Sequence, residues 1–234
     1  MLSVLSVKAD LLTLCYLALS TLPFSASLAS QQAVDSKITI LSKVTKEQLQ
    51  NKVLLDAREL KTCQTSSVTG AKCLPTNTFH SPQGNLASFY NIAWAFSTAG
   101  LKETDDVLIF SDKAQDRAAL AGLLFLSGQH KVSYWSGEVT DLQRLLSKAP
   151  GKGRGIIRSH IYRGVMRDKY IALPSEIKKL QKMGWRVVGA GKLASEPSSK
   201  ERKLIINGKQ PIKNIAKFAE LNAKGHDQLL LSID

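Results

Sequence analysis

Short apolar runs alternate with longer segments of helical periodicity between residues 37 and 147. Buried strands of a parallel sheet have this appearance, because both of their faces are covered by other parts of the protein. We therefore expect five strands in this part of the chain. They are predicted at residues 37–41, 53–58, 70–75, 105–110 and 131–135.

Helices are predicted between these strands. The first is short and begins at Thr45, whose hydroxyl can cap it. Three longer helices are predicted at residues 86–99, 117–127 and 139–147, and glycines at 100 and 128 close the first two of them. This alternation predicts an α/β domain, a mostly parallel five-stranded sheet with helices on both faces. Ligands of such sheets bind at the carboxyl ends of strands, here the loop after Phe110.

The first 29 residues have the order of a secretory signal peptide. Lys8 and Asp10 precede an apolar run at residues 11–22, and small residues follow up to a cleavage site near Ala29. A membrane anchor or a buried helix is the alternative, but the run is shorter than the ~20 residues that a span needs and Pro23 ends it. We expect a periplasmic or secreted protein with no stable membrane span after cleavage.

Two cysteines, Cys63 and Cys73, remain after cleavage, in a compartment that would be oxidising. A disulfide between them would restrict the unfolded chain and contribute ~3 kcal/mol to stability. Two free thiols, or two separately buried cysteines, are the alternatives, because spacing does not fix geometry. The four histidines are scattered and no pair has the spacing of a metal site, so we expect neither a metal nor a cofactor.

The formal net charge of +13 is concentrated in the second half of the chain. Between residues 148 and 217 there are 18 Lys and Arg residues against 4 acidic residues. Such a field can recruit a lipid head group, a polysaccharide or an acidic protein, although a solvated face that only keeps the protein soluble is the alternative. Nucleic acid is not expected, because the basic residues lack the interleaved aromatic residues of a stacking platform.

Residues 38–146 resemble the rhodanese family. The shared features are an apolar strand that ends at Asp56 and continues into Arg58, a Gly-Ala pair before Leu74, and a strand that ends at Phe110 and runs into a loop with Arg117. Their order and spacing carry the resemblance. It implies a rhodanese-like sheet whose last strand is inserted between the first and the fourth.

Active members of that family carry a catalytic cysteine directly after the central strand, where this chain has Ser111. A persulfide requires a thiolate, which a serine hydroxyl cannot replace. The loop resembles that of dual-specificity phosphatases in length, and its N–H groups with two basic residues could still bind a small anion such as a sulfur oxyanion. A loop that binds nothing is the alternative. The predicted loop consists of Ser111, Asp112, Lys113, Ala114, Gln115, Asp116 and Arg117.

The C-terminal region resembles a damaged second copy of the same domain. We align residues 170–183 with 38–51, residues 204–211 with 70–75, and residues 227–232 with 106–111. The chain ends before the last strand of such a copy, and we expect residues 155–162 to fill that gap, or else to be a basic linker packed on the first domain. The predicted parts are a signal peptide (1–29), a rhodanese-like domain (36–148), a basic linker (149–168) and a smaller, degenerate α/β second domain (169–234).

Together these observations predict an exported, catalytically silent rhodanese-like protein that binds an anionic ligand or an acidic partner. One alternative is sulfurtransferase or thiol–disulfide chemistry at Cys63 and Cys73. Another is an envelope protein that adheres to anionic polymers through its basic C-terminal half.

Overall fold

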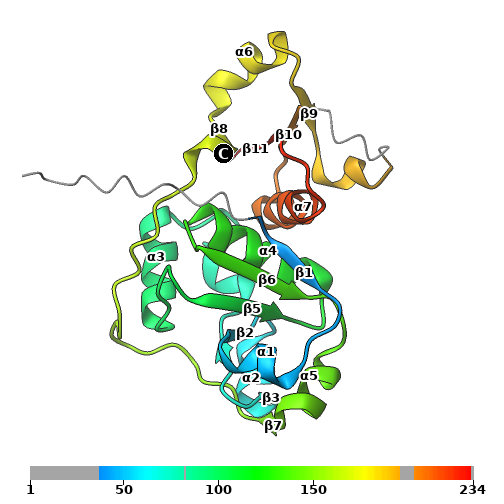
Figure 1. Ribbon diagram of the computed structural model, residues 1–234. Coiled ribbons are helices and arrows are strands. Elements are labelled where there is room, and N and C mark those ends of the chain that lie inside the picture. Colours follow the sequence, from blue (N-terminus) through cyan, green and yellow to red (C-terminus); the bar gives the residue numbers. More distant parts are fainter. Residues whose placement is uncertain (1–36, 82, 196–202, 233–234) are drawn as a thin grey trace, which may run out of the picture. The chain divides into compact units, whose positions relative to one another are not determined.

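The computed structural model describes residues 37–81, 83–195 and 203–232, so the predicted signal peptide lies outside the described residues. Five parallel strands form the larger sheet, in the order β1-β6-β5-β2-β4 (Figure 1). The last of them, β6, lies between β1 and β5, as the rhodanese resemblance implies. These strands are β1 (Thr39–Leu41), β2 (Val53–Asp56), β4 (Lys72–Cys73), β5 (Asp106–Phe110) and β6 (Lys131–Trp135).

The predicted cover of helices on both faces of this sheet is confirmed. Alternate residues of β5 point to opposite faces, so Leu108 packs in one apolar cluster with residues of α1 and α5, and Ile109 packs in another with residues of α3 and α4. Thr45 caps α1 through a capping box. The helices are α1 (Lys46–Gln50), α2 (Leu60–Thr65), α3 (Phe89–Thr98), α4 (Ala114–Leu126) and α5 (Val139–Leu146), with a 3-10 turn, η1, at Thr76–Phe79.

A second parallel sheet follows, in the order β8-β11-β10-β9. Its strands are β8 (Ile171–Ala172), β9 (Arg186–Val188), β10 (Leu204–Ile206) and β11 (Leu229–Ser232). Its helices are α6 (Ile177–Lys182) and α7 (Pro211–Ala223), with 3-10 turns η2 (Asp168–Tyr170), η3 (Pro174–Glu176) and η4 (Ala190–Ser195).

Two details of the predicted second copy are wrong. Because β10 pairs with both β9 and β11, it has the place that β5 has in the first sheet, not the place of an edge strand at residues 70–75. Similarly, β11 lies between β8 and β10, which is the place of β6 and not that of β5. The gap that residues 155–162 were expected to fill therefore does not exist, and this segment forms no strand.

The helices α4 and α7 pack directly against each other at Gly122. A Cβ atom at Gly122 would lie 2.6 Å from Cγ2 and 2.8 Å from the carbonyl oxygen of Ile215, so only a glycine allows this approach. Phe125 of α4 also contacts the ring of Phe218 on α7, with 6.1 Å between ring centroids. Residues 35–234 accordingly form one compact unit, with one apolar cluster that includes side chains from both sheets.

The segment that connects the sheets lies on the surface of the first one. It begins at β7 (Lys148–Ala149), which pairs antiparallel with β3 (Ser67–Val68), and it then passes along α3 without forming a helix or a regular strand (Figure 1). Residues 155–162 are therefore a basic linker packed on the first domain, which was the second of the two alternatives, and not a strand of the second sheet. Among the described residues, no helix combines the length and the apolar character needed to cross a membrane.

Candidate functional site

Ser111 lies directly after β5, at the carboxyl end of the larger sheet. The strand β5 is central, with β6 on one side and β2 on the other, so this position is where a parallel sheet places its ligands. The side chain is buried, with 1% of the residue exposed, and its Oγ accepts a hydrogen bond of 3.3 Å from the backbone N–H of Lys113. Ser111 is therefore part of a tight turn and not of an open loop.

The loop at this position is shorter than the predicted seven residues. Only Ser111, Asp112 and Lys113 form the turn, since α4 already begins at Ala114. The N–H groups of Asp116 and Arg117 donate to the carbonyl of Lys113 at 3.1 and 3.3 Å. Two of the N–H groups that were predicted to bind an anion are therefore used within the helix. The reason is local: the segment contains neither glycine nor proline, and Ala114 and Gln115 are good helix formers.

Three of the four charged side chains around this turn, those of Asp112, Asp116 and Arg117, have partners within the protein. The guanidinium group of Arg117 donates to the carbonyl of Ser111 at 3.1 Å and to that of Ser136 at 3.2 Å. Asp116 accepts a hydrogen bond of 3.2 Å from Thr76. Asp112 lies 3.6 Å from Arg58. Lys113 and Gln115 are exposed and Arg117 is half-buried, so Lys113 is the more exposed of the two basic residues that were predicted to help bind an anion.

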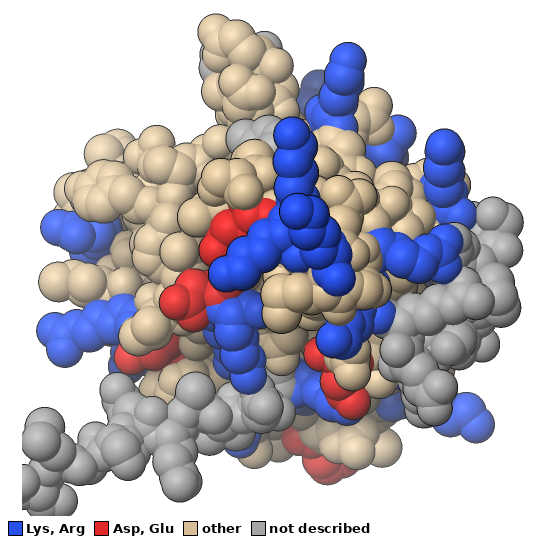
Figure 2. Space-filling view, turned by 90° about the horizontal axis from the view of Figure 1, so that it is seen from above, with Lys and Arg blue, Asp and Glu red and all other residues tan. Residues whose placement is uncertain are grey.

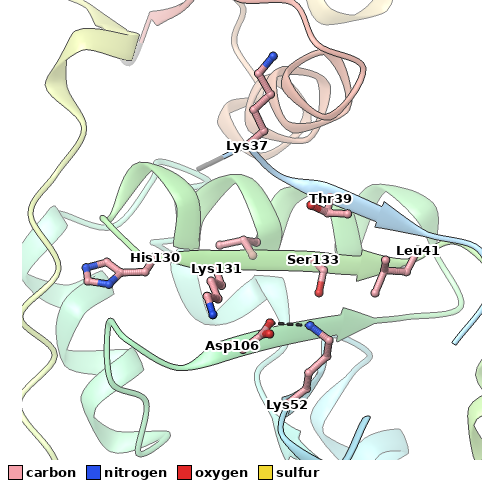
Figure 3. A pocket seen from close by; sticks show the side chains of 9 residues that line it. Lys37, Thr39, Leu41, Lys52, Asp106, His130, Lys131 and Ser133 are labelled. Atoms are coloured by element: carbon pink, nitrogen blue, oxygen red, sulfur yellow. Dashed lines mark hydrogen bonds and ion pairs between the residues drawn. The ribbon is translucent and has the colours of Figure 1, made fainter. Parts of the chain in front are cut away.

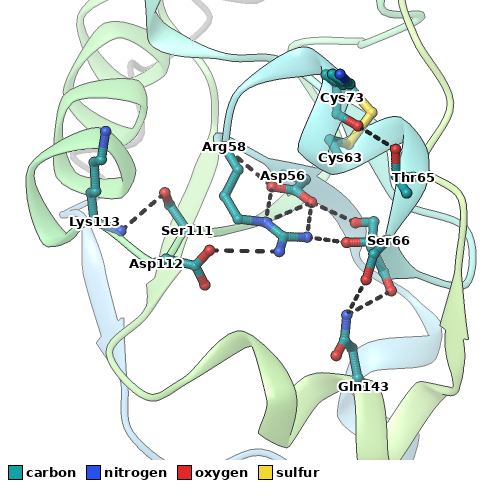
Figure 4. A network of polar contacts seen from close by, with 12 residues as sticks. Asp56, Arg58, Cys63, Thr65, Ser66, Cys73, Ser111, Asp112, Lys113 and Gln143 are labelled. Carbon is teal, nitrogen blue, oxygen red and sulfur yellow. Dashed lines mark hydrogen bonds and ion pairs between the residues drawn. A yellow bond between two sulfur atoms is a disulfide. The ribbon is translucent and has the colours of Figure 1, made fainter.

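A buried polar network lies beside the turn, at the end of β2 (Figure 4). Asp56 is fully buried, and Arg58 donates to both of its carboxylate oxygens, at 3.0 and 2.7 Å. Ser67 donates to the same carboxylate at 2.6 Å, and Arg58 also donates to the carbonyl of Ser66. Burial acts to lower the pKa of Arg58, but the hydrogen bond and charge of Asp56, with a smaller effect of Asp112, outweigh it, so the pKa is raised.

Asp56, Arg58 and Ser67 of this network are not among the site residues predicted from the sequence. The sequence did indicate the network, because the apolar strand predicted at residues 53–58 ends in two charged residues, Asp56 and Arg58. Charged residues rarely become fully buried unless they are paired. The position of the network explains the geometry of the turn: Arg58 neutralises Asp56 and approaches Asp112. The pair thus fixes one side of the turn at Ser111.

The two cysteines form the predicted disulfide. Cys63 in α2 and Cys73 in β4 are both fully buried, and their Cα atoms are 5.8 Å apart. The glycine at position 151 packs against both sulfur atoms. The alternative of two free thiols is therefore wrong for this structure, and neither sulfur is exposed for reaction.

Two cavities lie away from Ser111. One has a volume of about 210 Å³ and is lined by the first residues of β5 and β6, at the opposite end of these strands (Figure 3). In it Lys52 pairs with Asp106 at 2.6 Å, while Lys37 turns away to Asp227 at 3.0 Å, so the cations do not converge. The other, of about 360 Å³, is lined by residues just before β8, β9 and β11, by the first two residues of β11, and by Lys37 and Asn222. None of the residues 111–117 lines either cavity.

Nothing in the described stretches groups three or more His, Cys, Asp or Glu side chains around a point where a metal ion could sit. His130 borders the smaller cavity but points away from its ion pair. Ser111 and the neighbouring Asp56–Arg58 ion pair thus lie together at the ends of two strands, at the position where the family resemblance predicts a site.

No protein-family model matches the sequence, and no curated protein matches it. Solved structures do match. The mercaptopyruvate sulfurtransferase SseA from Escherichia coli aligns with a TM-score of 0.63 and 11% identity, over 82% of this chain and 97% of that one. An anaerobic ergothioneine biosynthesis enzyme from Chlorobium limicola aligns with a TM-score of 0.59 and 11% identity, over 85% of this chain and 60% of that one.

A chain described as a "Probable Thiosulfate Sulfurtransferase" aligns with a TM-score of 0.51 and 11% identity, over 79% of this chain and 92% of that one. The chain thus spans nearly all of two of these proteins and about three fifths of the other. Identities of 9–12% support a common fold and leave activity open. The parallel order of the larger sheet, with β6 between β1 and β5, and these alignments lead to one conclusion: the chain has the rhodanese fold.

Proposed function

We propose that this chain is an exported rhodanese-fold protein without sulfurtransferase activity that acts by binding an anionic partner. The observation that carries this proposal is the buried Ser111 directly after the central strand β5. The sequence resemblance puts the sulfur-carrying cysteine of active rhodaneses at this position. Export rests on the signal-peptide pattern of the first 29 residues.

The chemistry around Ser111 supports a silent site. Sulfur transfer needs a thiolate that attacks the sulfane sulfur and holds it as a persulfide, and a hydroxyl stays protonated at neutral pH. Activation of a serine needs an adjacent base. The nearest carboxylate in sequence, Asp112, lies beside the Arg58 guanidinium, and the Ser111 hydroxyl already accepts a bond from Lys113.

The alternative, sulfur or disulfide chemistry at Cys63 and Cys73, has less support. Both residues are fully buried and joined to each other, so neither presents a thiolate. Reduction would have to precede any reaction. The proposal therefore gives the disulfide a structural role, which links α2 to the edge strand β4.

An extended anionic partner fits the geometry better than a small oxyanion at the Ser111 turn. Two N–H groups of the loop that was predicted to bind an anion form hydrogen bonds within α4, and Arg117 donates to two carbonyls of the protein. The basic second half offers more, because residues 148–217 contain 18 Lys and Arg residues against 4 acidic residues. Figure 2 shows Lys and Arg side chains that project at many places from the face seen from above, with several acidic side chains between them. The partner classes that this favours are an anionic polymer, a lipid surface and an acidic protein.

The proposal includes a duplicated architecture. The order β8-β11-β10-β9 of the second sheet corresponds to the order β1-β6-β5-β2 of the larger sheet. The second sheet then lacks only a counterpart of the edge strand β4. In each sheet the helix between the two central strands, α4 or α7, packs at the same interface. The alignment over 82% of the chain supports this, since the first sheet and its helices make up roughly half of the chain.

Two measurements test the proposed function. The chain should form no thiocyanate from thiosulfate and cyanide above the level of the Ser111→Ala variant, and it should be retained on dextran sulfate with a steep dependence on salt. Turnover that exceeds that of the variant would refute the silent Ser111 site, and equal turnover of both proteins above a protein-free blank would refute the absence of sulfurtransferase activity. Elution at low salt would refute binding through the basic half, and earlier elution of the Ser111→Ala variant would move the binding site to the Ser111 turn.

A further inference from the structure

A segment of sixteen residues between the two sheets, residues 152–167, is fixed to the first domain at its start, in its middle and at its end. We call it the strap. At its start Lys152 donates from its N–H to the carbonyl of Ala71 at 2.8 Å, and Gly155 donates to the carbonyl of Thr98 at 2.9 Å. At its end the N–H of Arg167 donates to the carbonyl of Leu126 at 2.8 Å.

The middle of the strap is anchored by Tyr162. Its ring is buried against Phe96 of α3, with 5.0 Å between centroids, and its N–H donates to Ser97 Oγ at 2.9 Å. Gly164 lies so close to the carbonyl of Ser127 that a Cβ atom there would overlap it. These contacts hold the irregular backbone of the strap in place without a helix or a sheet.

The apolar side chains of the strap, apart from Tyr162, point outward. Ile156 is 97% exposed, Ile157 80% and Val165 77%, and Ile161 and Met166 are exposed as well. Single exposed apolar residues are common, but five large ones within eleven residues of an anchored segment form a patch that the rest of the described chain leaves uncovered. Such a patch marks an interaction surface.

Positive charge accompanies this patch. The strap contains five Lys and Arg residues and no acidic residue. The guanidinium of Arg158 lies 4.7 Å from the ring centroid of Trp94 on α3, and Trp94 and Tyr90 of the same helix are themselves partly exposed. The surface therefore combines aliphatic tips, arginines and amphipathic aromatic rings, which is the composition of segments that lie at a membrane interface.

We infer that the strap and the adjacent residues Tyr90 and Trp94 of α3 dock this protein on an anionic lipid surface. The inference rests on the proposed function and names its partner. An acidic protein is a poorer fit, because the exposed isoleucines stand on an irregular outer segment and neither described cavity is lined by strap residues. Isoleucines insert among the acyl chains while the arginines meet the lipid phosphates, so both features of the patch are used.

Binding to vesicles tests this inference. Residues 35–234 form one compact unit, so the test uses the chain from Gln31 onward, which lacks the apolar run at 11–22. It should co-sediment with vesicles of phosphatidylcholine and phosphatidylglycerol but not with vesicles of phosphatidylcholine alone. The double change Ile156→Ser and Ile157→Ser should lower the partition coefficient by about tenfold or more, because two apolar side chains no longer enter the acyl region.

A matched pair of charge variants separates the strap from general basicity. Arg158→Gln with Arg163→Gln should weaken vesicle binding by roughly tenfold, whereas Lys178→Gln with Lys182→Gln, which removes the same charge from exposed positions of α6, should weaken it by less than about threefold. All variants should keep the melting temperature of the parent chain. As a second readout, vesicles should shift the tryptophan fluorescence to shorter wavelength, and Trp94→Phe should remove this shift.

The outcomes distinguish this inference from the proposed function. Vesicle binding that is absent, or that falls equally in the strap and α6 variants, overturns the lipid assignment. If dextran sulfate still retains the chain in that case, the proposed binding of an anionic partner stands. If neither vesicles nor dextran sulfate bind, both fail.

Discussion

Asp56 and Arg58, two residues apart at the end of β2, form a buried ion pair in which the guanidinium group contacts both carboxylate oxygens. Ser67 donates a further hydrogen bond to Asp56, so the buried charge has several partners. This pair stands beside the turn of Ser111 and approaches it through Asp112. The strongest electrostatic feature of the site is thus structural, and it holds a turn that has no thiol.

Removal of one member of this pair should destabilise the protein strongly. Arg58→Met leaves the fully buried carboxylate of Asp56 without its counterion, and such a change costs about 3–5 kcal/mol. Urea unfolding followed by circular dichroism measures the loss. The exposed pair of Arg144 and Asp141 supplies the control: Arg144→Met should cost less than about 1 kcal/mol. Equal losses in the two variants would contradict this account of the network.

The contact between α4 and α7 should depend on Gly122. A side chain at this position would overlap Ile215 and its carbonyl, so Gly122→Val should destabilise the protein by about 2 kcal/mol or more despite the higher helix propensity of valine. Gly191→Val, where no atom lies within 4 Å of a Cβ, is the matched control and should cost little. A Gly122→Val protein as stable as the parent would mean that the two helices do not pack as described.

The disulfide should stabilise the protein without being required for binding. Its loss in the Cys63→Ser, Cys73→Ser variant should lower the free energy of unfolding by about 3 kcal/mol, because the unfolded chain gains freedom. Retention on dextran sulfate should be unchanged. A variant that keeps its stability but loses retention would point to a functional role for the cysteines.

Stability should fall at alkaline pH in part through Tyr134. Burial, with a smaller effect of Glu220, raises its pKa to about 12, although Arg117 acts in the opposite direction. In the unfolded chain a tyrosine ionises near pH ~10. Between these values the unfolded state has lost the proton and the folded state keeps it, so stability declines as the pH rises from about 10 to about 12, by roughly 2 kcal/mol.

Urea unfolding of the parent and of Tyr134→Phe, near pH ~9 and near pH ~11.5, measures this contribution. The variant should lose less of its stability over that interval. The buried Tyr162, whose pKa burial also raises, should add a decline of the same sign in both proteins. Identical pH profiles for parent and variant would show that Tyr134 does not stay neutral in the folded state.

Much of the larger sheet could be predicted from the sequence because its strands are buried on both faces. The run from Val107 to Phe110 is fully buried, and three residues of β2 and four of β6 are buried as well. The sequence also predicted the helix cap at Thr45 and the glycine that ends α3 at position 100, whose φ is 68°. Each of these residues meets a local conformational requirement.

The second sheet was harder because its strand order depends on long-range pairing. Similar short apolar runs at 204–206 and 227–232 gave no signal for which of them lies in the centre, so β10 and β11 were aligned with the wrong strands of the first sheet. The start of α4 at Ala114 differs from the predicted start at Arg117, because the polar run at residues 111–116 favoured a loop although its Ala and Gln residues are good helix formers. The Asp56–Arg58 pair was visible only as charge at a strand end.

Mass spectrometry after exposure to thiosulfate tests the central claim most directly. The intact parent protein should gain no sulfur atom, because Ser111 cannot form a persulfide and Cys63 is joined to Cys73. The variant Ser111→Cys restores a thiol and tests whether the turn could still accept sulfur. Because residue 111 is buried just before α4, we expect no stable persulfide in this variant either. A sulfur atom added to the parent protein, mapped to any of its residues by peptide digestion, would contradict the account.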